Sequence, residues 1–237
     1  MACSNPGKGL IHGGPGYCFC AASDMTAKIS SFQDFADFAA QWEDLPADPY
    51  LEGEPFRFRR HARAVFDADS GEVTFLPPGS YLQAAENNPL FGGISRQFAP
   101  IAWTAAGTRL AGALIRVSVT DVLGLHGQTL INLHQVRIVG GPQLAGAPVP
   151  EGPHRDGFDY ISIHLIGRDA DGGGETSLIA DGRTAATMTL SEPLDAVYVD
   201  DRKYTHDTTP IIGRGRQVTR DVLLMSFEPA GSGSSLS

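Results

Sequence analysis

The chain has 237 residues, 42% of them hydrophobic and 19% charged, and its formal net charge is −9. This composition predicts one large globular domain and excludes global disorder. The sequence has no run of lysine or arginine and no apolar stretch of about eighteen residues that would span a membrane. We therefore expect a small-molecule partner rather than a nucleic acid or a membrane.

The first 24 residues are rich in glycine, proline, serine and cysteine and lack the apolar core of a signal peptide. They predict a disordered lead, with a single domain over residues 25–229 and a flexible tail over 230–237. The thiols of Cys18 and Cys20 could form a metal or redox pair, although two thiols near a flexible end more often have no such role. No cysteine lies in the rest of the chain, which favours a reducing cytoplasm.

The first regular elements are a helix and a strand. Aromatic and alanine residues recur at helical spacing over residues 33–42, with serine and aspartate near the start as caps. Residues 56–63 alternate apolar and basic side chains, which predicts a strand that includes Arg59. Its arginines have two interpretations, a solvated strand face or a set of cations for an acidic small molecule, and both remain open.

Most of the remaining elements are short strands. A strand over 73–76 and a helix over 108–123 come first. Further strands are expected over residues 129–139, 160–166, 175–179, 186–190, 195–200 and 220–227. Regular strands joined by glycine and proline turns indicate a sandwich or barrel. The sequence thus predicts a mainly β protein with N-terminal helices, folded as a cupin-like double-stranded β-helix, or jelly roll.

The segment around His154-x-Asp156 carries the strongest functional signal. Residues two apart in an extended strand point to the same face, so both side chains can reach one point. His206, which follows a later strand, is the best candidate for a third ligand. Two histidines and one carboxylate with open positions are typical of non-haem Fe(II) oxygenases, whereas zinc more often has a closed set of ligands.

Open positions on the metal leave room for a bidentate co-substrate and O₂. A co-substrate such as 2-oxoglutarate has a second carboxylate that needs a cation, and three arginines follow His206. Arg214 and Arg216 lie in a glycine-containing turn, which favours solvent exposure. Arg220 begins the last strand, where a buried guanidinium is costly unless it pairs with an anion, so we prefer it as the anchor.

His164 shares the strand parity of His154 and Asp156 but is a poor fourth ligand. Ten residues of extended chain span roughly 33 Å, too far for an unbroken strand to return to the metal. We interpret it as a packed histidine or one that supports the ligands.

A set of short motifs resembles the Fe(II)/2-oxoglutarate dioxygenase family of L-isoleucine 4-hydroxylase-like free amino-acid hydroxylases. Together these motifs cover roughly residues 50 to 228. They are Gly92-Gly93 with Arg96-Gln97-Phe98, Leu133-His134-Gln135-Val136-Arg137, His154-x-Asp156, His164-Leu165, Gly173-Gly174 with Leu178-Ile179-Ala180, Glu192-Pro193-Leu194, His206-x-x-Thr209-Pro210 and Arg220-Asp221-x-Leu223-Leu224-x-x-Phe227.

The resemblance implies a jelly roll in which His154, Asp156 and His206 bind Fe(II) and Arg220 anchors 2-oxoglutarate. It also implies a reaction with O₂ that yields succinate and CO₂ and oxidises an unactivated C–H bond of a free L-amino acid. Hydroxylation is the expected outcome, and desaturation or ring closure could use the same iron site. The family also has a histidine at the position of His164, which gives that residue more than a packing role.

A free amino acid needs a cation for its carboxylate and an acceptor for its ammonium. The candidates for the carboxylate are Arg96, Arg59 and Arg137, and those for the ammonium are Glu175 and Asp159. The pair Gln135 and Arg137 either lines the pocket or forms a polar sheet face. Two other classes compete with an oxygenase: a cupin-like metal-dependent isomerase or hydrolase, and a non-catalytic jelly-roll binding module.

Overall fold

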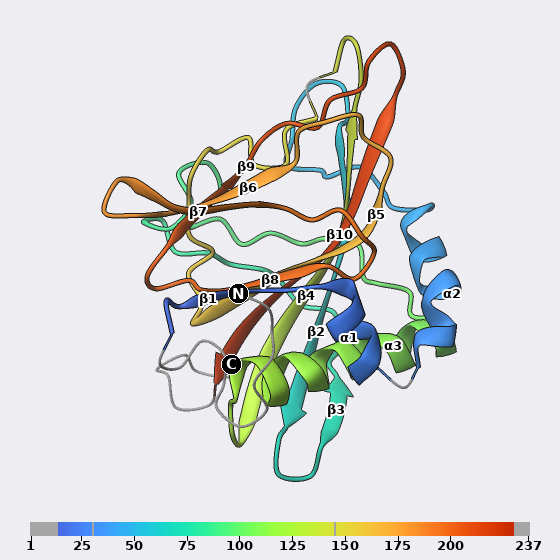
Figure 1. Ribbon diagram of the computed structural model, residues 1–237, viewed down its shortest axis with the longest axis vertical. Helices are drawn as coiled ribbons and strands as arrows, with labels where there is room; N and C mark the ends of the chain where they lie inside the picture. The colour runs from blue at the N-terminus through green and yellow to red at the C-terminus, as the bar shows by residue number, and fades with distance from the viewer. Residues whose placement is uncertain (1–13, 30, 145, 230–237) are drawn as a thin grey trace.

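The computed structural model describes residues 14–29, 31–144 and 146–229. Over these residues the chain forms two antiparallel sheets (Figure 1). The larger sheet has, in spatial order, β1 (Tyr17–Cys20), β8 (Ala196–Asp200), β5 (Tyr160–Arg168), β10 (Val218–Pro229), β4 (Gln128–Gly140), β2 (Arg57–Asp67) and β3 (Glu72–Phe75). The smaller sheet has β7 (Arg183–Thr189), β6 (Glu175–Ala180) and β9 (Thr205–Thr208). The mainly β architecture with N-terminal helices matches the prediction.

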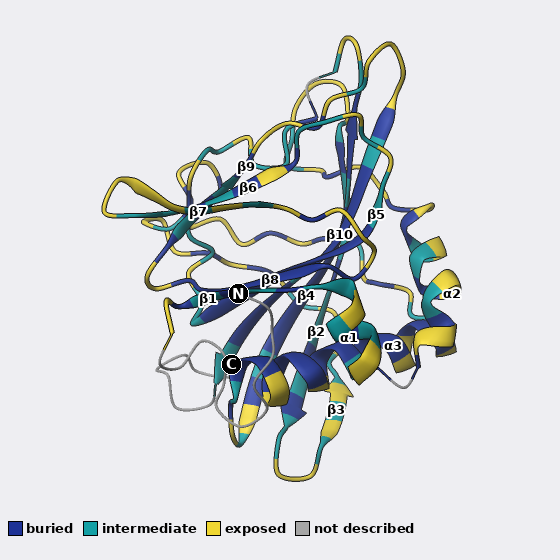
Figure 2. Ribbon diagram, in the orientation of Figure 1, coloured by how far each residue is buried: buried dark blue, intermediate teal, exposed yellow. Residues whose placement is uncertain are grey.

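The larger sheet separates two apolar clusters because side chains alternate along each strand. On β4, Leu133 belongs to the cluster beneath the helices and Val136 to the cluster on the opposite face. On β10, Leu223 and Val222 divide in the same way. Figure 2 shows β4, β5 and β10 buried along most of their length, because they are covered on both faces. The predicted site residues Arg59 and Arg220 lie on the face that is turned away from the helices.

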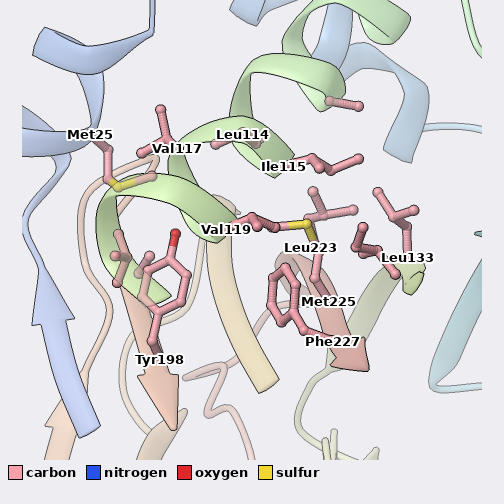
Figure 3. Packing of buried hydrophobic residues seen from close by; sticks show 14 of the residues in the cluster. Met25, Leu114, Ile115, Val117, Val119, Leu133, Tyr198, Leu223, Met225 and Phe227 are labelled. Atoms are coloured by element: carbon pink, nitrogen blue, oxygen red, sulfur yellow. The ribbon is translucent and has the colours of Figure 1, made fainter. Parts of the chain in front are cut away.

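The helix expected over residues 108–123 is present as α3 (Ala105–Arg116) followed by a π-helical segment, η3 (Val117–Leu123). Thr104 caps α3, because its hydroxyl accepts the N–H of Gly107 at 3.0 Å. Figure 3 shows Leu114 and Ile115 packed near Leu133 and Leu223 of the sheet. Burial of this apolar face fixes the helix on the large sheet and stabilises the side opposite the functional residues.

The helix expected over residues 33–42 is also present, as the short segments η1 (Phe32–Asp34), α2 (Phe35–Ala39) and η2 (Ala40–Trp42). Trp42 is fully buried, and its Nε1–H lies 3.2 Å from the carbonyl oxygens of both Val136 and Val222. This side chain therefore ties the N-terminal helices to the two central strands.

The N-terminal lead is ordered where the structure describes it, which corrects the disorder expected there. Strand β1 pairs antiparallel with β8, and α1 (Ala22–Lys28) buries Met25. The thiol of Cys18 is buried, and burial raises its pKa to about 12, which argues against a metal or redox role for it. Residues 1–13 and the tail over 230–237 lie outside the described residues. Within the described part of the chain, no helix is both long and apolar enough to cross a membrane.

Candidate metal centre

Two segments far apart in the sequence meet at a short β-bridge. His154 lies in the connection before β5, and His206 lies on β9, opposite Leu178 of β6. The N–H of His154 donates to the carbonyl of His206 at 3.1 Å, and the N–H of His206 donates back at 2.8 Å. The two imidazole rings consequently lie with their centroids 4.5 Å apart.

Asp156 completes the predicted group of three. Its Oδ1 lies 3.5 Å from Nε2 of His154, and its Oδ2 lies 3.9 Å from Nε2 of His206. One ligand atom from each residue lies within 4.8 Å of the other two, so the three could hold a metal ion. His154 Nδ1 is 3.1 Å from the carbonyl of Gly152, which leaves Nε2 for the metal.

Burial and mutual charge set the protonation of this group. For Asp156, burial is outweighed by the hydrogen bond with His154 and by the charges of the histidines, so its pKa lies well below the usual range. For His154, burial is likewise outweighed by Asp156, and its pKa rises to about 9. Burial and the charge of His154 lower the pKa of His206 to about 4. A bound cation would release the proton of His154 and pair with the carboxylate.

Asp201 is a supporting residue that the sequence analysis missed. Its carboxylate accepts the N–H groups of Asp156 at 3.3 Å, Gly157 at 2.7 Å and Phe158 at 3.1 Å. Its Oδ1 also lies 4.0 Å from Nδ1 of His206. Gly157 has a φ of 88°, a left-handed conformation that favours glycine. Asp201 thus holds the backbone at Asp156 and lies beside the second imidazole.

Gln83 fixes the carboxylate of Asp156 from the other side. Its Nε2 donates to Oδ1 of Asp156 at 2.8 Å. Its Oε1 accepts from Asn88 Nδ2 at 3.1 Å and from Nη2 of Arg96. Both ends of the Gln83 amide are therefore engaged, and Arg96 reaches the carboxylate of Asp156 through it.

The three residues open into a cavity lined by strands of both sheets, with about 830 Å³ of space including its mouth. Polar side chains gather around the metal centre and at Arg220, and apolar side chains line the walls. The apolar residues are Val136, Ile138, Pro148, Val149, Ile161, Ile163, Val222, Leu224 and Met225. A cavity in which polar groups converge beside apolar walls is typical of a small-molecule site.

Arg220 lines this cavity and is 2% exposed. Its Nε and Nη2 have no hydrogen-bond partner among the described residues. Burial, and then the charge of Arg168, lower its pKa to about 10, so it remains a cation at neutral pH. The alternatives Arg214 and Arg216 are exposed, and Arg216 pairs with Asp169 at 2.7 Å. A buried guanidinium with unused donors fits an anionic ligand.

A family model described as "2OG-Fe dioxygenase" matches residues 39–226 of the chain. The chain belongs to this family. Such enzymes are oxidoreductases that use Fe(II), 2-oxoglutarate and O₂, and the donors of His154, Asp156 and His206 suit that metal. The family assignment favours the oxygenase over the competing isomerase and binding-module interpretations.

Several known proteins are similar to this 2OG-Fe dioxygenase. The 3(1)-hydroxy-L-isoleucine 4-dioxygenase of Pantoea ananatis is 26% identical over 230 residues, which are 90% of this chain and 92% of that protein. A bsmA homologue from Methylobium petroleophilum has a TM-score of 0.75 at 24% identity, over 98% of this chain and 97% of that chain. IDO from Bacillus thuringiensis has a TM-score of 0.72 at 19% identity, over 90% of this chain and 94% of that chain. These structures confirm the jelly-roll fold.

The structure divides the predicted substrate residues of the dioxygenase into two groups. Arg59 and Arg96 are buried and line the cavity. Arg137 does not line the cavity, because the odd-numbered residues in this part of β4 face away from the cavity. Its guanidinium instead donates to Asp221 at 2.7 Å and to Glu43 at 2.9 Å. Gln135 is buried on the same face of the larger sheet, which is the face beneath the helices. Neither side chain of this pair lines the cavity.

The two acids predicted to receive the ammonium also lie away from the cavity. Asp159 lies 3.6 Å from Arg202 and lines a separate surface hollow, and Glu175 is exposed at the start of β6. Neither side chain lines the cavity beside the metal centre.

His134 lines the cavity. Its Nδ1 accepts from Arg59 Nη2 at 2.7 Å, and its ring stacks on His61 with centroids 4.5 Å apart. Burial and then the charge of Arg59 hold its pKa well below the usual value, so the ring is neutral. Its spacing of two residues from Val136 was the sequence signal that both side chains share one face of β4. His134 therefore orients an arginine and is absent from the group of residues that could bind metal.

His164 is a packed histidine. It is fully buried, shares a hydrogen bond of 3.0 Å with Ser162, and meets the ring of Tyr198 edge-on at 5.3 Å. Burial lowers its pKa to about 3. The distance argument against a fourth ligand agrees with its absence from the group of three.

The support given by Asp201 can be tested with Asp201→Asn. The amide keeps the size of the side chain but weakens the acceptor for three backbone N–H groups, so we expect Fe(II) affinity to fall by about 10- to 100-fold. Anaerobic titration with Fe(II) measures this, with Asp181→Asn on an exposed turn as the matched control. Unchanged affinity in Asp201→Asn would show that the carboxylate does not position the ligands.

Proposed function

We propose that this dioxygenase oxidises an unactivated C–H bond of a free L-amino acid, with hydroxylation as the outcome and release of succinate and CO₂. The observation that carries the proposal is the cavity itself. It joins a group suited to Fe(II), one buried arginine with unused donors, and a second group of arginines. The similarity to an enzyme named for its action on a hydroxylated L-isoleucine supports a substrate of this class.

In this proposal His154, Asp156 and His206 bind Fe(II). The bridge between the two histidine backbones fixes the imidazoles, and Gln83 and Asp201 orient the carboxylate and its backbone. Three protein ligands leave further positions for the keto-acid end of 2-oxoglutarate and for O₂. Bound iron and co-substrate supply the activation of O₂ and the oxidation of the C–H bond.

Arg220 binds the distal carboxylate of 2-oxoglutarate in this proposal. The guanidinium lies on a rigid strand and offers a planar fork that matches a carboxylate. Around it, Val222 and Ile138 contribute apolar walls that keep water from the co-substrate. Pairing with the anion offsets the cost of burying the cation.

Replacement of the proposed anchor gives a direct test. In Arg220→Ala the distal carboxylate loses a charged partner, so the Kd for 2-oxoglutarate should rise by about 10- to 150-fold. Anaerobic calorimetry on the Fe(II)-loaded protein measures the Kd without turnover. Arg214→Ala, at an exposed position in the bend before β10, should leave it unchanged. Equal Kd values in the two variants would remove Arg220 from its role.

The substrate class is tested by succinate release from the Fe(II)-loaded enzyme with each standard amino acid. We expect at least one to raise succinate formation well above the substrate-free rate and to yield a product heavier by one oxygen atom. Mass spectrometry identifies that product, and His206→Ala is the inactive control. If every free amino acid left the rate at background, the proposed substrate class would be wrong.

A further inference from the structure

Glu151 places a second carboxylate beside the metal centre. It lines the cavity, and its Oε1 lies 3.9 Å from Nε2 of His154, the nitrogen proposed to face the metal. Among the described residues that line the cavity, the carboxylates are Glu151 and Asp156. Asp156 belongs to the group of three, so Glu151 is the carboxylate left for another partner.

The carboxylate of Glu151 is buried and only half satisfied. Its side chain is 7% exposed, and its Oε1 accepts from Asn88 Nδ2 at 3.2 Å. Its Oε2 has no hydrogen-bond partner in the described part of the chain and lies 4.0 Å from Arg57 Nη1, too far for a hydrogen bond. A buried carboxylate oxygen without a donor is costly, which indicates a site for a cationic donor.

Cations with unused donors gather on the same part of the lining. Arg57 bonds Asp48 through Nε at 2.8 Å, and Arg59 lies 3.6 Å from the same carboxylate. Arg96 bonds Gln83. After these contacts, Arg57 Nη2, Arg59 Nε and Arg96 Nε have no partner within the described ranges.

Charge in this part of the cavity provides a place for one carboxylate group of a ligand. Three guanidiniums face two carboxylates, those of Asp48 and Glu151, and Asp48 is already committed to Arg57 and Arg59. Aromatic rings hold the arginines in place: Arg59 lies 4.1 Å over Phe98. A rigid cationic group next to a half-satisfied carboxylate matches a ligand with a negative and a positive end.

We propose that Glu151 accepts the α-ammonium of the substrate while Arg57, Arg59 and Arg96 bind its α-carboxylate. This inference rests on the proposed function and assigns the contacts of the substrate's charged groups to named residues. A 2-hydroxy acid or an N-acylated amino acid would leave Oε2 of Glu151 without its charged donor, so the site selects against both. Glu151 is thereby a specificity-determining residue that contacts the substrate.

The test is a pair of ligands crossed with a pair of proteins. The ligands are the standard amino acid that most stimulates succinate release and its 2-hydroxy acid counterpart, in which a hydroxyl replaces the ammonium. The proteins are wild type and Glu151→Gln, both loaded with Fe(II) and 2-oxoglutarate under nitrogen. Calorimetry gives each Kd without turnover. Glu175→Gln, an exposed acid outside the cavity, is the matched control.

For the wild type we expect the amino acid to bind about 10- to 150-fold more tightly than the hydroxy acid. Glu151→Gln should lose most of this preference by weakening amino-acid binding alone, whereas Glu175→Gln should keep it. The wild-type comparison stands even if Glu151→Gln fails to fold.

Three results would overturn the inference while leaving the proposed function standing. They are equal wild-type affinity for the two ligands, an unchanged preference in Glu151→Gln, and loss of Fe(II) binding in that variant, which would assign Glu151 to the metal centre. Failure of the proposed function is distinguishable, because no amino acid would then stimulate succinate release, and the inference would fall with it.

Discussion

Two backbone hydrogen bonds between His154 and His206 are the constraint on which the site depends. They join a loop that precedes β5 to a strand of the smaller sheet, and so place two imidazoles side by side. Because the link is made by main-chain atoms, it depends on the fold of both sheets rather than on one side chain. Asp156 lies two residues from His154, and Asp201 and Gln83 hold its backbone and its carboxylate at the same point.

Around this bridge the interior carries more charge than a protein core normally tolerates. Four arginines line one cavity, and each is expensive to bury without a partner. Asp48, Gln83 and His134 satisfy part of the need for three of them, and Arg220 is left with open donors. This unequal satisfaction separates one end of the cavity, suited to a simple anion, from another that pairs cations with Glu151. The distal carboxylate of 2-oxoglutarate would pair with Arg220 at the first end, and a zwitterionic substrate would bind at the second.

The sequence predicted the three residues that the structure brings together and the buried position of Arg220, for physical reasons. The His154-x-Asp156 spacing carries its own geometry, and an arginine at the start of a terminal strand signals a buried anion site. Strand parity on β4 shows that Arg137 and His134 face opposite ways, but not which face meets the cavity; the position of the helices decides that. Glu151 lies in a glycine- and proline-rich loop without periodicity, so only the folded chain shows where its carboxylate points.

The N-terminal strand was missed because Tyr17–Cys20 has four residues and follows a stretch rich in glycine and proline. Pairing with β8 supplies the order that the preceding sequence does not indicate.

The most direct measurement of the central claim is the visible absorption spectrum of the protein with Fe(II) and 2-oxoglutarate in the absence of O₂. Chelation of ferrous iron by the keto acid should give a weak charge-transfer band in the wild type, and the band should be missing from His206→Ala. A wild-type protein without the band, or a His206→Ala variant that keeps it at full strength, would contradict the assignment of this centre.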